Sequence, residues 1–375
     1  MVISTRTLKW LSTISRLILA TTFIISGFSK VIDPWGTTLK VDEYLAIYHF
    51  EELLPLSMAF SIWLCGAELM MGCMLMCKVR IRLVSIFALV SMAFFSLLSL
   101  LSATLLPVED CGCFGDAIKL TPWETFFKNI ILLPMAAIVW YRYRPDKIFA
   151  FKPTEIALTI LFFSLSMGVG IYCVRHLPLV DFLPYKVGVN LREARLNPDE
   201  QTINEDIEHS LTTLIYRNKQ SGELREFSLN DSEWQDESLW EWVETKTDFD
   251  TPSIRPIISE FALRTKERDI TAEVLESDGK LYLLCVNKIK RLTKKCEERF
   301  ALLIDRAEKE GAKVICITPD RIPDSGYITF GNSYPIMCCN IDVHTIKTIL
   351  RANNGVVELT DGIITDKRNC RDIGK

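Results

Sequence analysis

Long apolar stretches constrain this chain more than any other feature. An α-helix needs about 20 mostly apolar residues to cross the hydrocarbon core of a bilayer. Residues 83–108 contain no charged side chain, residues 156–174 contain none, and residues 54–77 contain one. Two weaker stretches, residues 8–32 and 122–143, contain a few charges. We therefore expect five membrane-spanning helices, four of them close together in sequence and a fifth after a short cytoplasmic turn.

Three charged residues inside these stretches need an explanation. We expect Arg16 and Lys30 to extend toward the lipid headgroups, because each lies near an end of the first stretch. Glu68 lies in the middle of the stretch over residues 54–77. A carboxylate at such a position is costly and usually faces the bundle interior or a water-filled cavity. Its neighbours Gly66 and Gly72 allow close helix packing. Two roles remain open for Glu68: a neutral, hydrogen-bonded packing residue that pairs with a neighbouring helix, or a proton-handling group.

The distribution of cations predicts the orientation, because short loops rich in lysine and arginine stay in the cytoplasm. Such residues cluster before the first stretch, after the second and after the fourth: Arg6, Lys9, Arg16, Lys78, Arg80, Arg82, Arg142, Arg144 and Lys147. With five spans, this pattern places the N-terminus in the cytoplasm of a bacterial cell. Residues 37–53, the loop after the third span and everything beyond about Arg175 then lie outside the inner membrane, in the periplasm.

The composition changes near residue 180, from apolar sequence to the mixed, charged sequence of a soluble module. The net charge of −4 over 375 residues gives no reason to expect nucleic acid as a partner. We expect a four-helix membrane domain over residues 1–148, the fifth helix over residues 149–180, a linker and accessory region over residues 181–261, and a soluble α/β domain over residues 262–375.

The loop after the third span contains two closely spaced cysteines, Cys111 and Cys113, in the segment VEDCGCFGDAIK. Thr121, Pro122 and Glu124 follow it as a helix start. In an oxidising compartment, Cys111 and Cys113 are expected to pair with each other or to exchange with a partner thiol. A disulfide across one residue closes a cramped ring that is easily reduced, and Gly112 allows the bend. The alternative interpretation is that Cys111 and Cys113 form a permanent structural disulfide, or that they bond to separate partners.

The last hundred residues alternate between strand and helix patterns. Strands are predicted at residues 280–288, 312–320 and 334–342, helices at residues 292–310 and 344–352, and a final hairpin around the Asp361–Gly362 turn. This order resembles a thioredoxin-like domain. It departs from that family because the first strand-to-helix junction lacks a C-x-x-C pair. Cys296 is interpreted as a lone cysteine that lies too far into the helix to play the roles of both cysteines of such a pair. Cys370 is interpreted as the most exposed thiol. We expect a catalytically degenerate domain that recruits a partner.

The membrane half resembles a known family. The segments RLILATTFIISGFSKVIDPWG, GAELMMG and CGCFGD are similar to the methylamine utilisation protein MauE and to the wider DoxX-like membrane proteins. The resemblance implies a four-helix bundle related to the vitamin K epoxide reductase-like thiol oxidoreductases, and a part in disulfide handling for exported partner proteins. On this resemblance Cys111 and Cys113 carry the thiol chemistry and Glu68 occupies the acidic position of the second helix.

Two functions follow from the sequence. The first is a thiol-disulfide oxidoreductase of the lipid bilayer, with a membrane quinone as its candidate electron acceptor. The second is a membrane scaffold without enzymatic activity, in which the CGC pair is structural. A transporter built around Glu68 is less favoured, because neither a broken helix nor an inverted repeat is visible. The cysteine and histidine spacing gives no zinc motif, and no metal is expected.

Overall fold

The computed structural model describes residues 5–105, 111–145, 152–195, 212–219, 224–227, 239–247 and 261–374. The chain divides into two compact units. One unit comprises Met1–Gly188 together with Ala262–Lys375, and the other comprises Val189–Phe261.

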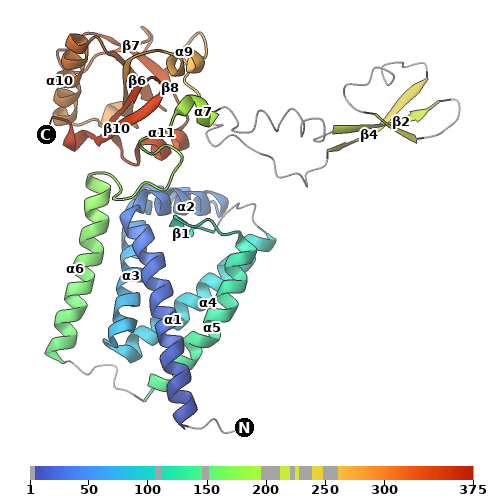
Figure 1. The fold of residues 1–375 in the computed structure, drawn as a ribbon, viewed down its shortest axis with the longest axis vertical. Coiled ribbons are helices and arrows are strands. Elements are labelled where there is room, and N and C mark those ends of the chain that lie inside the picture. Colours follow the sequence, from blue (N-terminus) through green and yellow to red (C-terminus); the bar gives the residue numbers. More distant parts are fainter. Residues whose placement is uncertain are drawn as a thin grey trace. The chain divides into compact units, whose positions relative to one another are not determined.

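The first part of the larger unit is a bundle of long helices (Figure 1). These are α1 (Thr5–Ile32), α3 (Ser57–Cys77), α4 (Ile81–Thr104), α5 (Pro122–Tyr143) and α6 (Pro153–Arg175). Helix α1 packs against α3 and α5, α4 packs against α5, and α3 packs against α6. The bundle therefore surrounds α1 and α3, the two helices that hold the charged residues of interest.

Four of these helices are long and apolar enough to cross a membrane: α1, α3, α4 and α6. The predicted fourth span does form a helix, α5, but it is not among these candidates. Its charged residues Glu124, Lys128 and Arg142 lower its mean hydropathy relative to the others. The five predicted spans are thus five helices in the structure, of which four qualify as candidate membrane spans.

The prediction that Arg16 and Lys30 extend to the headgroups is wrong. Both side chains are buried. Arg16 Nη1 donates to the carbonyl oxygens of Leu75 at 2.5 Å and Met76 at 2.8 Å. Both carbonyls lie in the last turn of α3, where a helix runs out of its own amide donors, and the Leu75 carbonyl also accepts from the amide of Lys78 at 3.4 Å. Lys30 turns inward to Glu68. Inside the bundle each cation finds a polar partner, which removes the reason to reach the headgroups.

Close packing of α3 against its neighbours depends on its small residues, as predicted. A Cβ atom at Gly72 would lie 2.7 Å from the backbone nitrogen of Ile24 on α1. One at Gly66 would overlap the side chain of Met167 on α6. Glycine at position 72 therefore lets α3 approach the backbone of α1, and glycine at position 66 leaves room for the Met167 side chain of α6.

Two short elements follow α1 and precede α3, in the stretch predicted to be an outer loop. Helix α2 (Pro34–Ile47) begins at Asp33, whose Oδ1 accepts from the amide of Gly36 at 3.4 Å, and η1 (Glu51–Leu56) follows it. The predicted cap of α5 is confirmed: Thr121 and Glu124 form the reciprocal pair of hydrogen bonds. Strand β1 (Cys113–Asp116) lies in the loop before this cap and contacts α1 and α2.

The smaller unit contains α7 (Leu191–Arg195) and a three-stranded antiparallel sheet. Its strands are β2 (Thr212–Asn218), β3 (Leu224–Phe227) and β4 (Trp240–Thr247), with β2 in the centre. Strands β2 and β3 pair as an antiparallel hairpin. Most of its turn, and most of the linker and accessory region expected over residues 181–261, lie outside the described residues.

The C-terminal part of the larger unit is a six-stranded mixed sheet in the order β10-β9-β5-β6-β8-β7. Its strands are β5 (Lys280–Val286), β6 (Lys313–Thr318), β7 (Tyr327–Ile328), β8 (Ile336–Asn340), β9 (Asn354–Thr360) and β10 (Ile363–Asn369). Its helical elements are α9 (Thr271–Leu275), η3 (Ile289–Arg291), α10 (Lys294–Glu310), α11 (Val343–Leu350) and η4 (Cys370–Asp372). The predicted strands, helices and final hairpin are confirmed. The thioredoxin-like fold itself stays a prediction.

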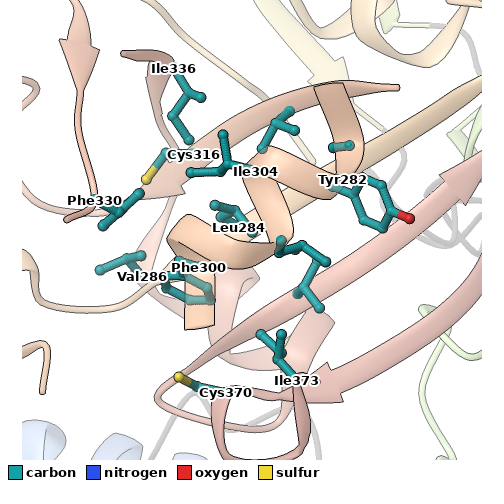
Figure 2. Packing of buried hydrophobic residues seen from close by; sticks show 14 of the residues in the cluster. Tyr282, Leu284, Val286, Phe300, Ile304, Cys316, Phe330, Ile336, Cys370 and Ile373 are labelled. Atoms are coloured by element: carbon teal, nitrogen blue, oxygen red, sulfur yellow. The ribbon is translucent and has the colours of Figure 1, made fainter. Parts of the chain in front are cut away.

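The core of this domain packs α10 against one face of the sheet (Figure 2). Phe300 and Ile304 of α10 contact a cluster that includes Leu284 of β5 and Cys316 of β6. The alternate residues of β5 face the other way, as the period of two in a strand requires.

Two cysteine predictions for this domain are wrong. Cys296 and Cys370 form a disulfide, so Cys296 has a partner and Cys370 is not a free thiol. Cys370 is also buried, with 6% of its surface exposed. Cys296 is the third residue of α10 and therefore lies in its first turn. A contact across 74 residues leaves no local signal, which is why sequence spacing did not reveal it.

Candidate functional site

The CGC loop is held by a few backbone contacts around its two glycines. The amide of Cys111 donates to the carbonyl of Leu120 at 3.2 Å, and the amide of Gly115 donates to the carbonyl of Gly112 at 3.1 Å. Gly112 has φ +60°, a left-handed conformation that favours glycine. Ser26 of α1 donates to the carbonyl of Cys113. The loop is therefore a tight turn anchored to the end of α1.

The two thiols of the loop interact directly. Both cysteines are reduced and half-buried. The Cys111 thiol donates a hydrogen bond to the Cys113 sulfur, which lowers the pKa of Cys113 to about 6 against the opposing effect of burial. The same contact, together with burial, raises the pKa of Cys111. Cys113 is thus the thiolate at neutral pH and Cys111 the protonated donor, an arrangement suited to nucleophilic attack by Cys113.

Two lysines add to the stabilisation of the Cys113 thiolate. Lys128 of α5 and Lys30 of α1 both lower the pKa of Cys113 through their positive charges. The ammonium of Lys128 also lies 4.6 Å from the centre of the Phe114 ring, a cation–π distance. The thiolate therefore faces cations from two different helices.

Glu68 reaches the site through Lys30. Lys30 Nζ lies 2.7 Å from Glu68 Oε2, and both side chains are nearly buried. The pair joins α1 to α3 in the bundle interior, where each charge compensates the other. Glu68 and Cys113 line the same cavity. The structure thus brings together all three residues predicted from sequence, with Lys30 between the carboxylate and the thiolate.

Tyr44 of α2 is a site residue that the sequence did not single out. Its hydroxyl lies 3.2 Å from Ser102 Oγ and 3.9 Å from Cys111 Sγ. Burial raises the pKa of Tyr44, so the phenol stays protonated and can hydrogen-bond the Cys111 sulfur. Tyr44 and Ser102 are separated by 58 positions, and no local motif marks such a pair.

A cavity of about 300 Å³ opens beside the thiols. Its walls come from α1 to α5 and from the CGC loop, and they are mostly apolar. Polar groups gather near the loop, whereas side chains such as Leu64, Phe94, Phe95 and Leu98 line the rest. This cavity can accept an apolar molecule with one polar end directed at the cysteines.

A metal centre finds no support in the part of the chain that the structure describes: it contains no group of three His, Cys, Asp or Glu side chains suited to hold an ion.

Four long apolar helices followed by a sheet domain define an integral membrane protein with an appended globular part. The family model described as Methylamine utilisation protein MauE matches residues 8–142. This N-terminal stretch, which contains Glu68 and both loop cysteines, is therefore similar to the MauE family. Searches among curated proteins and among solved structures found no match.

Proposed function

We propose that the protein exchanges thiols and disulfides through Cys111 and Cys113 at the membrane surface. The observation that carries the proposal is the hydrogen-bonded thiol pair beside a mostly apolar cavity, with two lysines near its thiolate. A permanent structural disulfide would need neither a lowered pKa at Cys113 nor cations placed around its sulfur. Glu68 contributes by holding Lys30 in place.

Disulfide exchange takes two steps. In the reduced form, the Cys113 thiolate attacks a disulfide of an exported partner protein and releases one partner thiolate, forming a mixed disulfide. Cys111 then loses its proton and attacks the Cys113 sulfur, releasing the second partner thiol. The partner gains two electrons from the CGC pair, one proton from Cys111 and one proton from water, and the CGC pair becomes a disulfide. The reverse sequence oxidises a partner dithiol.

A membrane quinone is the electron carrier that we propose for the apolar cavity. Oxidation of the Cys113 thiolate and the Cys111 thiol delivers two electrons and one proton, and a second proton from water completes the conversion of one quinone to one quinol. The lining fits an apolar ring and tail, and the cavity brings such a molecule within reach of both thiols. The relation to DoxX-like and vitamin K epoxide reductase-like proteins remains part of this proposal.

We place the loop and the C-terminal domain in the periplasm of a bacterial cell, with the N-terminus in the cytoplasm. The distribution of lysine and arginine supports this orientation. The Cys296–Cys370 disulfide supports it independently, because disulfides persist in oxidising compartments. On this proposal the C-terminal domain recruits the partner protein without catalysing exchange itself.

A scaffold without enzymatic activity is the second candidate. The disulfide-bonded, compact C-terminal domain favours it, because such a domain can dock a partner whether or not the CGC pair turns over.

Trapping of thiols in intact cells separates the two candidates. A membrane-impermeant maleimide is applied from outside, and the modified loop peptide is identified by mass spectrometry in the wild type, Cys111→Ser and Cys113→Ser. Exchange predicts a mixture of oxidised and reduced CGC pairs that shifts when quinone synthesis is blocked. A pair that stays fully oxidised or fully reduced under both conditions supports the scaffold.

A further inference from the structure

We infer that Arg351 of the C-terminal domain is a positioning residue for the CGC loop, which it fixes through Asp116. The inference rests on the proposed function for its purpose, but the contact itself does not. Arg351 ends α11, whereas Asp116 ends strand β1, three residues after Cys113. The appended domain therefore acts on the thiol pair of its own chain, in addition to any partner it recruits.

The contact is a buried cluster of one cation and two carboxylates. Arg351 is 1% exposed, and its Nη2 donates to Asp116 Oδ2. Its Nε lies 3.3 Å from Oδ2 of Asp33, which is also buried. An arginine presents several donors in one plane and can join two carboxylates at once, which a lysine cannot do with the same geometry. The cluster ties the start of α2 and the CGC loop to the same side chain.

The backbone around the cluster is arranged for this approach. Gly36 lies in the first turn of α2, and a Cβ atom there would overlap the Asp116 carboxylate. Arg351 itself has φ +53°, a left-handed conformation that residues other than glycine rarely adopt. Both features let the guanidinium and the two carboxylates meet, at positions where an ordinary residue or backbone would prevent it.

A second ion pair, next to the Arg351 cluster, also joins α11 to α2. Lys347 lies one turn before Arg351 on α11, and its Nζ is 3.5 Å from Asp42 Oδ2. This pair is partly exposed and does not touch the CGC loop. Helix α11 thus contacts α2 twice, and only the Arg351 contact extends to β1.

Loss of the Arg351–Asp116 contact should change the surroundings of the Cys113 sulfur. That sulfur faces Cys111 in its own loop, Lys30 from α1, Lys128 from α5 and, through Lys30, Glu68 from α3. These interactions require β1 to stay against the bundle. If Asp116 is released, β1 loses one of its attachments, and Cys113 moves away from the cations and toward water.

The test measures alkylation of Cys113 by iodoacetamide against pH in the full-length purified protein, with each site resolved by mass spectrometry. Asp116→Ala removes the loop carboxylate and keeps the Arg351–Asp33 contact, so the domain still docks. We expect its midpoint to rise by about one pH unit or more, from about 6 toward the ordinary cysteine value of about 8.5. Asp116→Asn, which keeps one acceptor oxygen, should fall between the wild type and Asp116→Ala.

Arg351→Gln should shift the midpoint at least as far as Asp116→Ala, and the double variant should shift it no further than Arg351→Gln alone. Arg321→Gln is the control, since this arginine of the same domain is 90% exposed in its side chain. It should leave the midpoint unchanged. If Arg351→Gln fails to fold, Asp116→Ala still decides the question.

An unshifted midpoint in Asp116→Ala overturns the inference even where the wild type exchanges disulfides. Conversely, if the wild type exchanges no disulfide while Asp116→Ala still shifts the midpoint, the result rejects the proposed function but supports the role of Arg351 in positioning the CGC loop.

Discussion

Replacement of Cys111 by alanine should sharply reduce the reactivity of Cys113. The Cys111 thiol is the largest stabilising contact of the Cys113 thiolate, whose pKa is about 6. A hydrogen bond to a charged group contributes about 1.5–3 kcal/mol. At 1.36 kcal/mol per unit, its loss raises the pKa by about 1.1–2.2 units. At pH 6 the thiolate fraction then falls from about one half by a factor of about 7 to about 80.

The assay is the rate of Cys113 alkylation at pH 6, divided by the rate at pH 9.5 in the same variant. The ratio cancels changes in exposure, because nearly all of the thiol is ionised at the higher pH. Cys111→Ser is the matched control: its hydroxyl can still donate, and its ratio should lie between those of the wild type and Cys111→Ala. A ratio in Cys111→Ala equal to that of the wild type would refute the assignment of Cys113 as the stabilised thiolate.

Three further predictions concern stability. Lys30→Gln leaves the Glu68 carboxylate buried without its cation and should lower the free energy of unfolding by about 3–5 kcal/mol, while adding Glu68→Gln should recover most of the loss in thermal unfolding in detergent. Opening the Cys296–Cys370 disulfide by Cys370→Ser should destabilise the C-terminal domain by about 4 kcal/mol in denaturant titrations, from the 74-residue separation. Burial raises the pKa of Asp33 from 3.8 to about 6, so its stabilising contribution is complete below pH 3.8 and is lost as pH rises through about 6; Asp33→Asn should flatten that fall in Tm.

Local signals in the sequence were sufficient for most elements. The cap of α5 was predictable because Thr121, Pro122 and Glu124 are adjacent and satisfy one another. The final hairpin was predictable because its turn requires two residues in left-handed conformations, and Asp361 and Gly362 have φ +51° and +80°. In both cases the information lies within a few residues.

The charged contacts of the site were not predictable in the same way. Lys30 and Glu68 are 38 positions apart, and Arg351 and Asp116 are 235 apart. Single-sequence reasoning gives the cost of a buried charge but not its partner, so it assigned Lys30 to the headgroups and considered a neutral Glu68. The thiols themselves were predictable, since their spacing is local. The direction of their interaction, with Cys111 donating to Cys113, depends on cations from other helices.

The ion pair between Lys30 and Glu68 also determines how the cavity responds to electron loss. With Lys128 and the Cys113 thiolate, these four groups comprise two cations and two anions. Lys40 also lines the cavity but pairs with Glu43 at 3.1 Å, so the charges around the reduced cavity balance. When the cysteines join, the thiolate charge disappears and one positive charge is left without a counterion. On the proposed exchange function, the oxidised cavity would then attract an incoming anion, such as the thiolate of a dithiol substrate, and the reduced cavity would not.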